Sequence, residues 1–230
     1  MKTYLSFGGG VNSTALALLL LSEGETFEAV FADTGAEYPE TYSYLAKAMK
    51  CIPITIVKPK DGNLVDYAHK HKMVPSNIIR WCTRIFKLDP ILAYYKKPCI
   101  QMIGIDAGES HRARMSPEEG VENYYPLVER GIDRQGCIDI INRYGLPIPR
   151  KSGCYICPFQ TISQWKALRK DHTDLWCKAL NLERRNIYYR RSQGKEPMYL
   201  YSNRKPLEVI VNEAQGELFE EYKPPCYCGR

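Results

Sequence analysis

The sequence lacks a hydrophobic run that approaches the roughly 20 residues of a membrane-spanning helix. Its apolar stretch at residues 15–21 also lacks the charged region and the cleavage site of a secretory leader. No internal repeat or low-complexity tract is present. These absences argue against a helical membrane span, a secreted protein and a repeat architecture. A cytoplasmic location without a membrane partner is therefore the expectation.

Histidine is also scarce, with four residues in the chain. They show no spacing typical of a metal site, and His69 and His71, two residues apart, would face different ways on a helix. No Ser-His-Asp arrangement can be recognised. A histidine-based metal centre and a serine-hydrolase triad are therefore not expected.

Cysteine, by contrast, is abundant, with nine residues among 230. The odd number and the missing leader argue against a disulfide framework. In a reducing compartment cysteines are more often buried, catalytic or bound to metal. Cys51, Cys99 and Cys137 lie in apolar or helical contexts and are predicted to belong to the core.

The formal net charge is +6, and it is unevenly placed. Residues 161–205 contain eleven Lys/Arg and four Asp/Glu. A basic region of this kind indicates an anionic partner, such as a nucleic acid. A solvated helix face is an equally open interpretation.

Short apolar runs alternate with helical patterns through the first half of the chain. This alternation predicts an α/β fold: a parallel five-stranded, doubly wound Rossmann-like sheet with helices on both faces. In such sheets ligands bind at the carboxyl ends of the strands. Strands are expected at residues 2–7, 27–32, 54–57 and 100–105, and helices at residues 12–22, 39–50, 64–72 and 84–95.

The pattern changes near residue 131. A helix is expected at residues 133–144, and a long helical region at residues 163–191 that breaks near His172. The chain is therefore predicted to comprise a nucleotide-binding domain at 1–130 and a helical, cysteine-bearing extension at 131–230 packed on it.

The segment after the first predicted strand is rich in glycine. Residues 8–14 read Gly-Gly-Gly-Val-Asn-Ser-Thr and run directly into a leucine-rich helix. Glycines let the backbone approach an anion closely, and the free N–H groups of a helix start point toward it. The segment lacks the Lys of the nucleoside-triphosphate P-loop and the dinucleotide fingerprint Gly-x-Gly-x-x-Gly. It predicts a phosphate site, with a glycine turn that holds no ligand as the open alternative.

This segment resembles the PP-loop, Ser-Gly-Gly-x-Asp-Ser-Thr, of the ATP pyrophosphatase superfamily. Gly8 stands where that pattern has Ser, and Asn12 stands where it has Asp. The resemblance implies that the loop binds the phosphates of ATP or of another adenine nucleotide. The implied contacts are Gly8, Gly9, Gly10, Asn12, Ser13 and Thr14.

Two later segments are similar to the phosphoadenylyl-sulfate reductase family, a branch of the same superfamily. Asp33-Thr34-Gly35, followed by Pro39-Glu40-Thr41, resembles its Asp-Thr-Gly…Pro-Glu-Thr signature. Residues 104–114 resemble its Gly-Ile-Arg-x-x-Glu-Ser-x-x-Arg stretch, with Asp106 in place of the first Arg. By position, Arg112 or Arg114 would neutralise phosphates. The implied nucleotide contacts are Asp33, Thr34, Gly35, Gly104, Glu109, Arg112 and Arg114.

Cysteines form a third point of resemblance. Residues 80–90 are similar to the family segment in which one or two cysteines precede a Lys and a Pro, and Cys82 is the one cysteine here. Cys154 and Cys157 form a Cys-x-x-Cys turn, which suits a metal, a cluster or a redox dithiol. The resemblance implies that Cys82 folds beside this turn.

The three cysteines do not by themselves identify the fourth ligand or the metal. Cys226 is the expected fourth ligand, ahead of Cys228 and Cys177. The expected cofactor is a 4Fe-4S cluster, held by three or four cysteines, and structural Zn²⁺ is the alternative.

The resemblance implies ATP cleavage to AMP and pyrophosphate with Mg²⁺, to activate an acceptor for sulfur transfer. The residues expected to carry the reaction are Asn12, Ser13 and Arg112. The basic 161–205 region would hold a nucleic-acid acceptor, and a sulfur or electron donor is implied. The alternatives are a sulfonucleotide reductase that produces sulfite and a non-catalytic nucleotide-binding module with structural zinc. The oligomeric state stays open, a homo-oligomer included.

Overall fold

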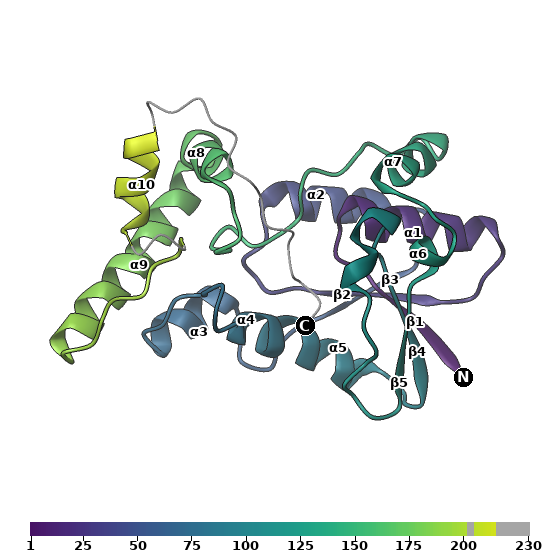
Figure 1. Ribbon diagram of the computed structural model, residues 1–230, viewed down its shortest axis with the longest axis horizontal. Helices are drawn as coiled ribbons and strands as arrows, with labels where there is room; N and C mark the ends of the chain where they lie inside the picture. Colours follow the sequence, from purple (N-terminus) through teal and green to yellow (C-terminus); the bar gives the residue numbers. More distant parts are fainter. Residues whose placement is uncertain (202–204, 215–230) are drawn as a thin grey trace.

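The computed structural model describes residues 1–201 and 205–214 (Figure 1). Five strands form one sheet in the order β3-β2-β1-β4-β5, and all neighbouring strands are parallel. The parallel five-stranded sheet that the sequence predicts is confirmed, although β5 coincides with none of the predicted strand ranges. The bounds are β1 Lys2–Ser6, β2 Glu28–Ala32, β3 Ile54–Val57, β4 Cys99–Ile103 and β5 Val121–Tyr124.

The central strand β1 ends beside its two neighbours, β2 and β4, at the edge of the sheet where ligands bind in such folds. Its last residue, Ser6, pairs with Val30 of β2 on one side and with Ile103 of β4 on the other. The carboxyl ends of the three strands therefore lie at the same edge. Because ligands of parallel α/β sheets bind at this edge, the loops after β1, β2 and β4 form the candidate site.

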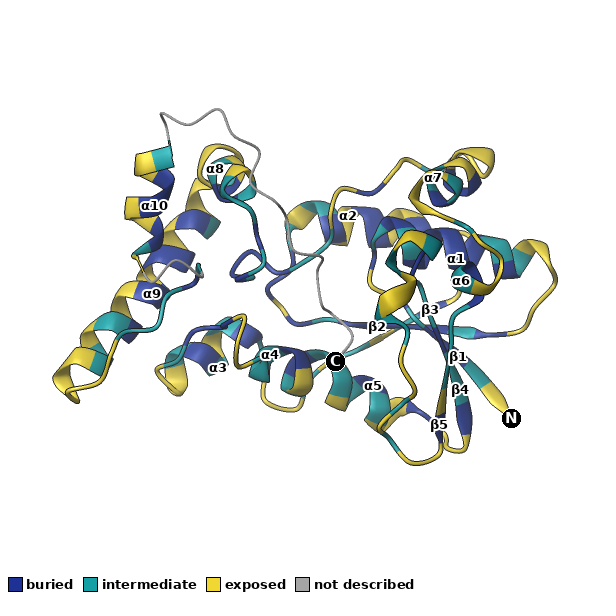
Figure 2. Ribbon diagram, viewed as in Figure 1, coloured by how far each residue is buried: buried dark blue, intermediate teal, exposed yellow. Residues whose placement is uncertain are grey.

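Helices cover both faces of the sheet because the strands alternate their side chains. Leu5 packs on one face with the core of α1, α2 and α7, whereas Tyr4 faces the other side and stacks on Tyr95, with ring centroids 4.3 Å apart. Figure 2 shows the buried residues gathered where α1 meets the sheet. The helices are α1 Val11–Ser22, α2 Pro39–Ala48, α5 Asp89–Tyr94 and α7 Arg134–Arg143.

A second hydrophobic cluster lies beside the sheet. Its largest buried side chains are Phe86, Trp165 and Trp176, which come from both halves of the sequence. The predicted boundary between residues 130 and 131 stays a prediction, since this cluster joins residues from both sides of it. The elements around it are α3 Leu64–Lys70, α4 Trp81–Thr83, α8 Ile162–Asp171, α9 Thr173–Ser192 and α10 Leu207–Glu213.

The helix predicted at residues 84–95 is divided in the structure. A π-helical turn, η1 at Arg84–Leu88, separates α4 from α5. Pro90 has no N–H to donate to the carbonyl of Phe86, so the regular α-helical ladder is interrupted there. The remaining short elements are η2 Ala107–Arg112 and α6 Pro126–Glu129.

The predicted break near His172 is confirmed. α8 begins with a capping box at Thr161, and His172 adopts a non-helical conformation with φ −137° and ψ 64° between α8 and α9. Its Nε2 lies 2.9 Å from Glu40 Oε1 at the start of α2. This contact joins the α8–α9 turn to the sheet domain.

Across the part of the chain that the structure describes, no helix is long and apolar enough to cross a membrane.

Candidate nucleotide-binding site

The glycine loop places the start of α1 at the carboxyl end of β1. Gly9 has a φ of +69°, a conformation that glycine adopts without a Cβ penalty. Gly10 is the N-cap of α1 and provides no side-chain cap, and the first intrahelical bond runs from the Thr14 N–H to the Gly10 carbonyl at 3.0 Å. The N–H groups of Val11, Asn12 and Ser13 therefore have no intrahelical acceptor. They form the donor cluster of an anion site.

The two hydroxyl residues of the loop shape it. Ser13 Oγ accepts the Gly8 N–H and donates to the Gly10 carbonyl, both at 3.2 Å. Thr14 is fully buried, and its N–H is used in the helix. Both residues were predicted as nucleotide contacts, and the structure gives each of them a bond or a position that fixes the loop.

Gly104 brings the end of β4 against the first turn of α1. A Cβ at this position would lie 2.8 Å from Ser13 N and 2.9 Å from the Asn12 carbonyl carbon. Those are backbone atoms, which cannot rotate away. Only glycine permits this approach, so the predicted nucleotide contact Gly104 also has a packing role.

Two of the three departures from the family patterns, Asn12 and Asp106, are neighbours in space. Asn12 Nδ2 donates to Asp106 Oδ2 at 2.9 Å, and Asp106 is buried and also caps η2 through the Glu109 N–H. Asn12 Oδ1 in turn accepts from Arg134 Nη1 at 2.8 Å. An amide can serve both partners at once because it has a donor end and an acceptor end.

Arg134 is a candidate functional residue that the sequence analysis did not single out. Its guanidinium is exposed and is held by Asn12 in the first turn of α1. The only sequence signal is its position in the first turn of the predicted helix at residues 133–144. A guanidinium there adds a cation beside the N–H groups of the glycine loop, and guanidinium groups match phosphate oxygens.

The arginines that follow β4 differ from one another. Arg112 Nη1 forms an ion pair with Glu109 Oε2 at 2.6 Å, and its side chain is mostly buried. Arg114 donates from its backbone N–H to Tyr125 Oη and from Nη1 to the Ala113 carbonyl. Arg112 is therefore oriented by an acid, whereas the backbone of Arg114 is held by Tyr125, the residue directly after β5. Their assignment to phosphate binding stays a prediction.

The loop after β2 is built around Asp33. Asp33 Oδ1 accepts the Gly35 N–H at 2.9 Å and the Tyr42 hydroxyl at 2.7 Å. Gly35 has a φ of +70°, and a Cβ there would lie 2.5 Å from the Cβ of Asn63. This turn is thus fixed at the same sheet edge as the glycine loop. The side chain of Thr34 points the other way and is fully buried.

Thr34 faces the Cys-x-x-Cys turn. Its Oγ1 donates to Glu37 Oε1 at 3.1 Å and lies 3.3 Å from Cys154 Sγ. Glu37 and Cys154 form an isolated antiparallel bridge, and the Tyr155 N–H donates to the Ala36 carbonyl at 2.9 Å. The segment after β2 is therefore joined along its backbone to the cysteine turn.

Glu37 is a second residue that the sequence analysis missed. It is a buried acid, and Cys154 Sγ donates to its Oε1 at 3.4 Å. Lys87 Nζ lies 3.7 Å from the same oxygen. An acid and an amine thus lie beside a buried thiol, and no motif in the sequence marked the acid.

The structure brings Cys82, Cys154 and Cys157 into the second hydrophobic cluster. Burial raises the pKa of both Cys82 and Cys154, and the charge of Lys87 opposes that rise at each thiol. Within residues 1–201 and 205–214, no group of three His, Cys, Asp or Glu side chains is placed to hold a metal ion. Cys226, the predicted fourth ligand, lies outside the described residues. Thiolates are ligands of both zinc and iron–sulfur clusters, and the ligand set stays a prediction.

The parallel sheet and the glycine loop together define the α/β fold of the PP-loop superfamily. Comparison with known families identifies the branch of this superfamily to which the chain belongs. The model of the phosphoadenosine phosphosulfate reductase domain matches residues 2–122, and the chain belongs to that family. Members of the family are typically enzymes.

Three individual relatives illustrate the match. Two are uncharacterized proteins of Methanocaldococcus jannaschii: MJ0973 is 28% identical over 80% of this chain, and MJ0066 is 22% identical over 78% of it. The chain covers 48% and 41% of those proteins, so it spans less than half of each. A crystal structure of phosphoadenylyl-sulfate reductase from Candida auris, a phosphate complex, has a TM-score of 0.54 and 19% identity. That similarity covers 67% of this chain and 81% of the reductase, and it shows the fold.

Proposed function

We propose that this protein binds ATP with its pyrophosphate in the loop at residues 8–14 and cleaves it to AMP and pyrophosphate. The activated acceptor would then receive sulfur. The observation that carries the proposal is the position of Arg134, whose guanidinium is held by Asn12 at the uncapped start of α1. A cation and a set of helix N–H groups are thereby directed to one place, which suits a multiply charged phosphate group.

The proposed chemistry uses charge stabilisation and positioning. An acceptor oxygen attacks the α-phosphorus, and the bond from that phosphorus to the bridging oxygen breaks. Pyrophosphate leaves with the electron pair, and its charge is stabilised by the N–H groups of Asn12 and Ser13 and by Arg134. A sulfur nucleophile then displaces AMP from the acceptor. When bound, Mg²⁺ would neutralise part of the phosphate charge.

The three cysteines Cys82, Cys154 and Cys157, called the cysteine cluster below, are proposed to serve the sulfur step. Cys82, Cys154 and Cys157 would hold an iron–sulfur cluster, with Cys226 as the proposed fourth ligand. If the three cysteines alone held the cluster, its fourth iron would be open and would supply a site for the sulfur atom to be delivered; with Cys226 as the fourth ligand, the cluster would have no open iron. Thr34 and Glu37 contact Cys154 and fix the orientation of this thiol relative to the loop after β2. This contact supports a connection between the nucleotide site and the cysteine cluster.

The test is incubation of anaerobically purified protein with α-labelled ATP and Mg²⁺, with and without bulk tRNA and DNA, following AMP and pyrophosphate. We expect pyrophosphate release. Arg134→Ala is expected to lower kcat/KM for that release by about 100-fold, because it removes one preorganised donor to the leaving group. Arg143→Ala is the matched control, since Arg143 is an exposed arginine at the other end of the same helix.

Three outcomes would contradict the proposal or the role it gives to Arg134. Sulfite formation from adenylyl sulfate or its 3′-phosphate, without ATP cleavage, would replace it by a sulfonucleotide reductase. No turnover in either assay, with nucleotide binding retained, would replace it by a non-catalytic binding module. Equal activity of the Arg134→Ala and Arg143→Ala variants would show that the leaving group is held elsewhere.

Removal of a cluster ligand gives a separate prediction. Anaerobically purified protein is expected to be brown and to contain iron and acid-labile sulfide, and Cys154→Ala is expected to lose both the colour and the iron. Cys51→Ala should retain them, because Cys51 lies in the loop after α2, remote in sequence from Cys82, Cys154 and Cys157. The prediction that Cys51 belongs to the core is wrong, since its side chain is exposed there. Absorbance and metal analysis measure the result. A colourless zinc protein would contradict the iron–sulfur assignment.

A further inference from the structure

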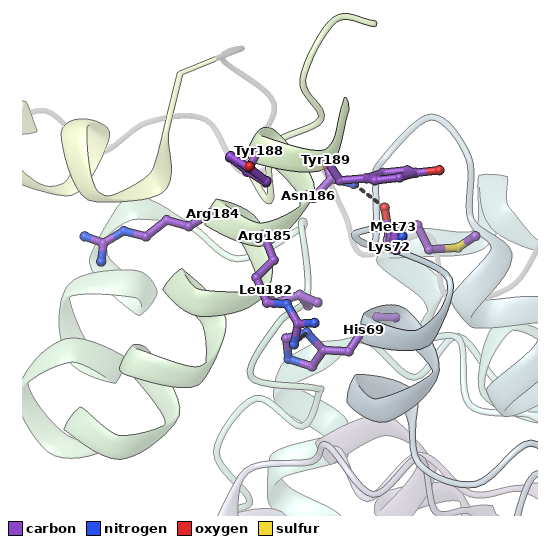
Figure 3. Close-up of a pocket in the computed structure, with 10 residues that line it drawn as sticks. His69, Lys72, Met73, Leu182, Arg184, Arg185, Asn186, Tyr188 and Tyr189 are labelled. Atoms are coloured by element: carbon purple, nitrogen blue, oxygen red, sulfur yellow. Dashed lines mark hydrogen bonds between the residues drawn. The ribbon is translucent and has the colours of Figure 1, made fainter. Parts of the chain in front are cut away.

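A groove separates the end of α3 from the second half of α9. It encloses a cavity of about 350 Å³, and its lining residues come from segments more than 100 positions apart in the sequence (Figure 3). None of the predicted nucleotide or cysteine residues lines it. The lining residues used below are His69, Lys72, Arg185, Asn186, Tyr188 and Tyr189.

The groove carries positive charge that is not neutralised by nearby acids. Within the described residues, neither Lys72 nor Arg185 forms an ion pair with a carboxylate. Lys72 Nζ lies 4.3 Å from the ring centroid of Tyr189, and Arg185 Nη1 lies 3.3 Å from His69 Nδ1. Figure 3 shows Arg185 directed across the groove toward His69. Both cations are thus held in place and keep their charge for a ligand.

Acids of α9 do not cancel this charge. Glu183 is buried and accepts the Leu200 and Leu207 N–H groups, each at 2.8 Å. Arg184 is paired with Glu208 of α10. Burial, and then the charge of Arg185, lower the pKa of His69, whereas the nearby carboxylate of Asp66 opposes this shift. The net positive charge of the groove is therefore a feature of its structure.

An exposed aromatic ring adjoins these cations. The side chain of Tyr188 is 79% exposed, although it is large and partly apolar. The ring of its neighbour Tyr189 already lies under Lys72, so the ring of Tyr188 is the one on which a ligand can stack. Cations that track a phosphate backbone, together with an exposed ring on which a base can stack, are the features of single-stranded nucleic-acid sites. An acidic peptide would use the cations but would leave the ring without a stacking partner.

We propose that the groove between α3 and α9 binds a single-stranded nucleic acid, with phosphates at Lys72 and Arg185 and a base stacked on Tyr188. The Asn186 side chain donates to the Lys72 carbonyl at 2.8 Å and fixes the two walls relative to each other. The groove is preformed by this bond, which lowers the ordering cost of binding.

The groove is also within reach of the candidate active site. The Leu64 N–H at the start of α3 donates to the Thr34 carbonyl, and Thr34 contacts Cys154. α3 has seven residues, so at 1.5 Å per residue its two ends are roughly 10 Å apart. A strand bound at the end of α3 can therefore place a neighbouring nucleotide near the cysteine cluster. As the identity of the sulfur acceptor this rests on the proposed function, whereas binding itself does not.

The experiment is fluorescence anisotropy with labelled 12-nucleotide single-stranded RNA and DNA and the matching duplex, over a series of salt concentrations. The double variant Lys72→Gln/Arg185→Gln is compared with the charge-matched control Lys47→Gln/Arg143→Gln, which changes exposed residues of α2 and α7. We expect the groove variant to bind at least tenfold more weakly. The slope of log K against log salt should fall by about 1.4, because two phosphate contacts are lost. Tyr188→Ala is expected to weaken binding about tenfold through lost stacking.

Each outcome bears on the proposal. Tighter binding of either single strand than of the duplex supports it, and the stronger of the two strands names the class of acceptor. Equal weakening in the groove and control variants, or equal affinity for the duplex, would overturn it. Release of pyrophosphate from ATP is measured on the same preparations. Oligonucleotide binding without ATP cleavage would contradict the proposed function alone, and ATP cleavage without oligonucleotide binding would contradict the groove proposal alone.

Discussion

Replacing Asn12 by Asp is expected to weaken nucleotide binding by about 100-fold, although it restores the residue that the PP-loop pattern has at this position. Asn12 Nδ2 lies 2.9 Å from Asp106 Oδ2, and Asp106 is 5% exposed. The substitution would set two carboxylates against each other in a buried place, where like charges are strongly unfavourable. The bond from Arg134 to the other side of this residue would survive, so the damage is confined to the contact with Asp106.

The reciprocal change tests this explanation. Asn12→Asp combined with Asp106→Asn exchanges the acid and the amide, and Asn caps helices about as well as Asp does, so the cap of η2 is kept. The double variant is expected to recover most of the lost affinity, measured by calorimetric titration of a non-hydrolysable ATP analogue. Full affinity in the single variant would mean that the contact between Asn12 and Asp106 does not organise the loop. A double variant no better than the single one would point to Asn12 itself as a ligand.

Gly104→Ala is expected to abolish measurable nucleotide binding and to lower the free energy of unfolding by about 1–3 kcal/mol, the range for overpacking a well-packed site. The added Cβ would lie 2.8 Å from Ser13 N and 2.9 Å from both the Asn12 carbonyl carbon and Ser13 Cα. Relief requires that β4 and the first turn of α1 move apart. That movement displaces the N–H groups that the proposed phosphate site uses.

Gly153→Ala is the control for this prediction. A Cβ at Gly153 would have no atom within 4 Å, and its φ lies outside the left-handed region, so the variant should be close to wild type. Urea unfolding gives the stability, and nucleotide titration of the folded fraction gives the affinity. Wild-type affinity in a stably folded Gly104→Ala protein would show that the loop tolerates displacement and that the proposed site lies elsewhere.

Much of the sheet domain could be predicted because its signals are local. Each signal is contained in a short stretch of sequence: the apolar runs at 54–57 and 100–105, and the glycine loop. Periodicity and turn chemistry therefore identified β3, β4 and the start of α1. β5 gave no such signal. Its four residues, Val121–Tyr124, include Glu122 and Asn123, because an edge strand with one neighbour can carry polar side chains.

The candidate site divides in the same way. The sequence pointed to Asn12, Gly104 and the cysteines through their motifs, but it treated Asn12 and Asp106 as two separate departures. The structure shows that they bond across 94 positions of sequence and that Arg134 reaches Asn12 across 122. No local pattern contains such pairs.

By itself, the sequence determined that this chain forms a parallel α/β sheet with a glycine loop before a buried helix, since strand period, glycine placement and helix starts depend on neighbouring residues. Only the tertiary structure decided which polar groups meet. Parallel strands need long crossover connections, so groups at one sheet edge come from distant segments. For the same reason Arg134, Glu37 and the α3–α9 groove became visible only when those segments were packed together.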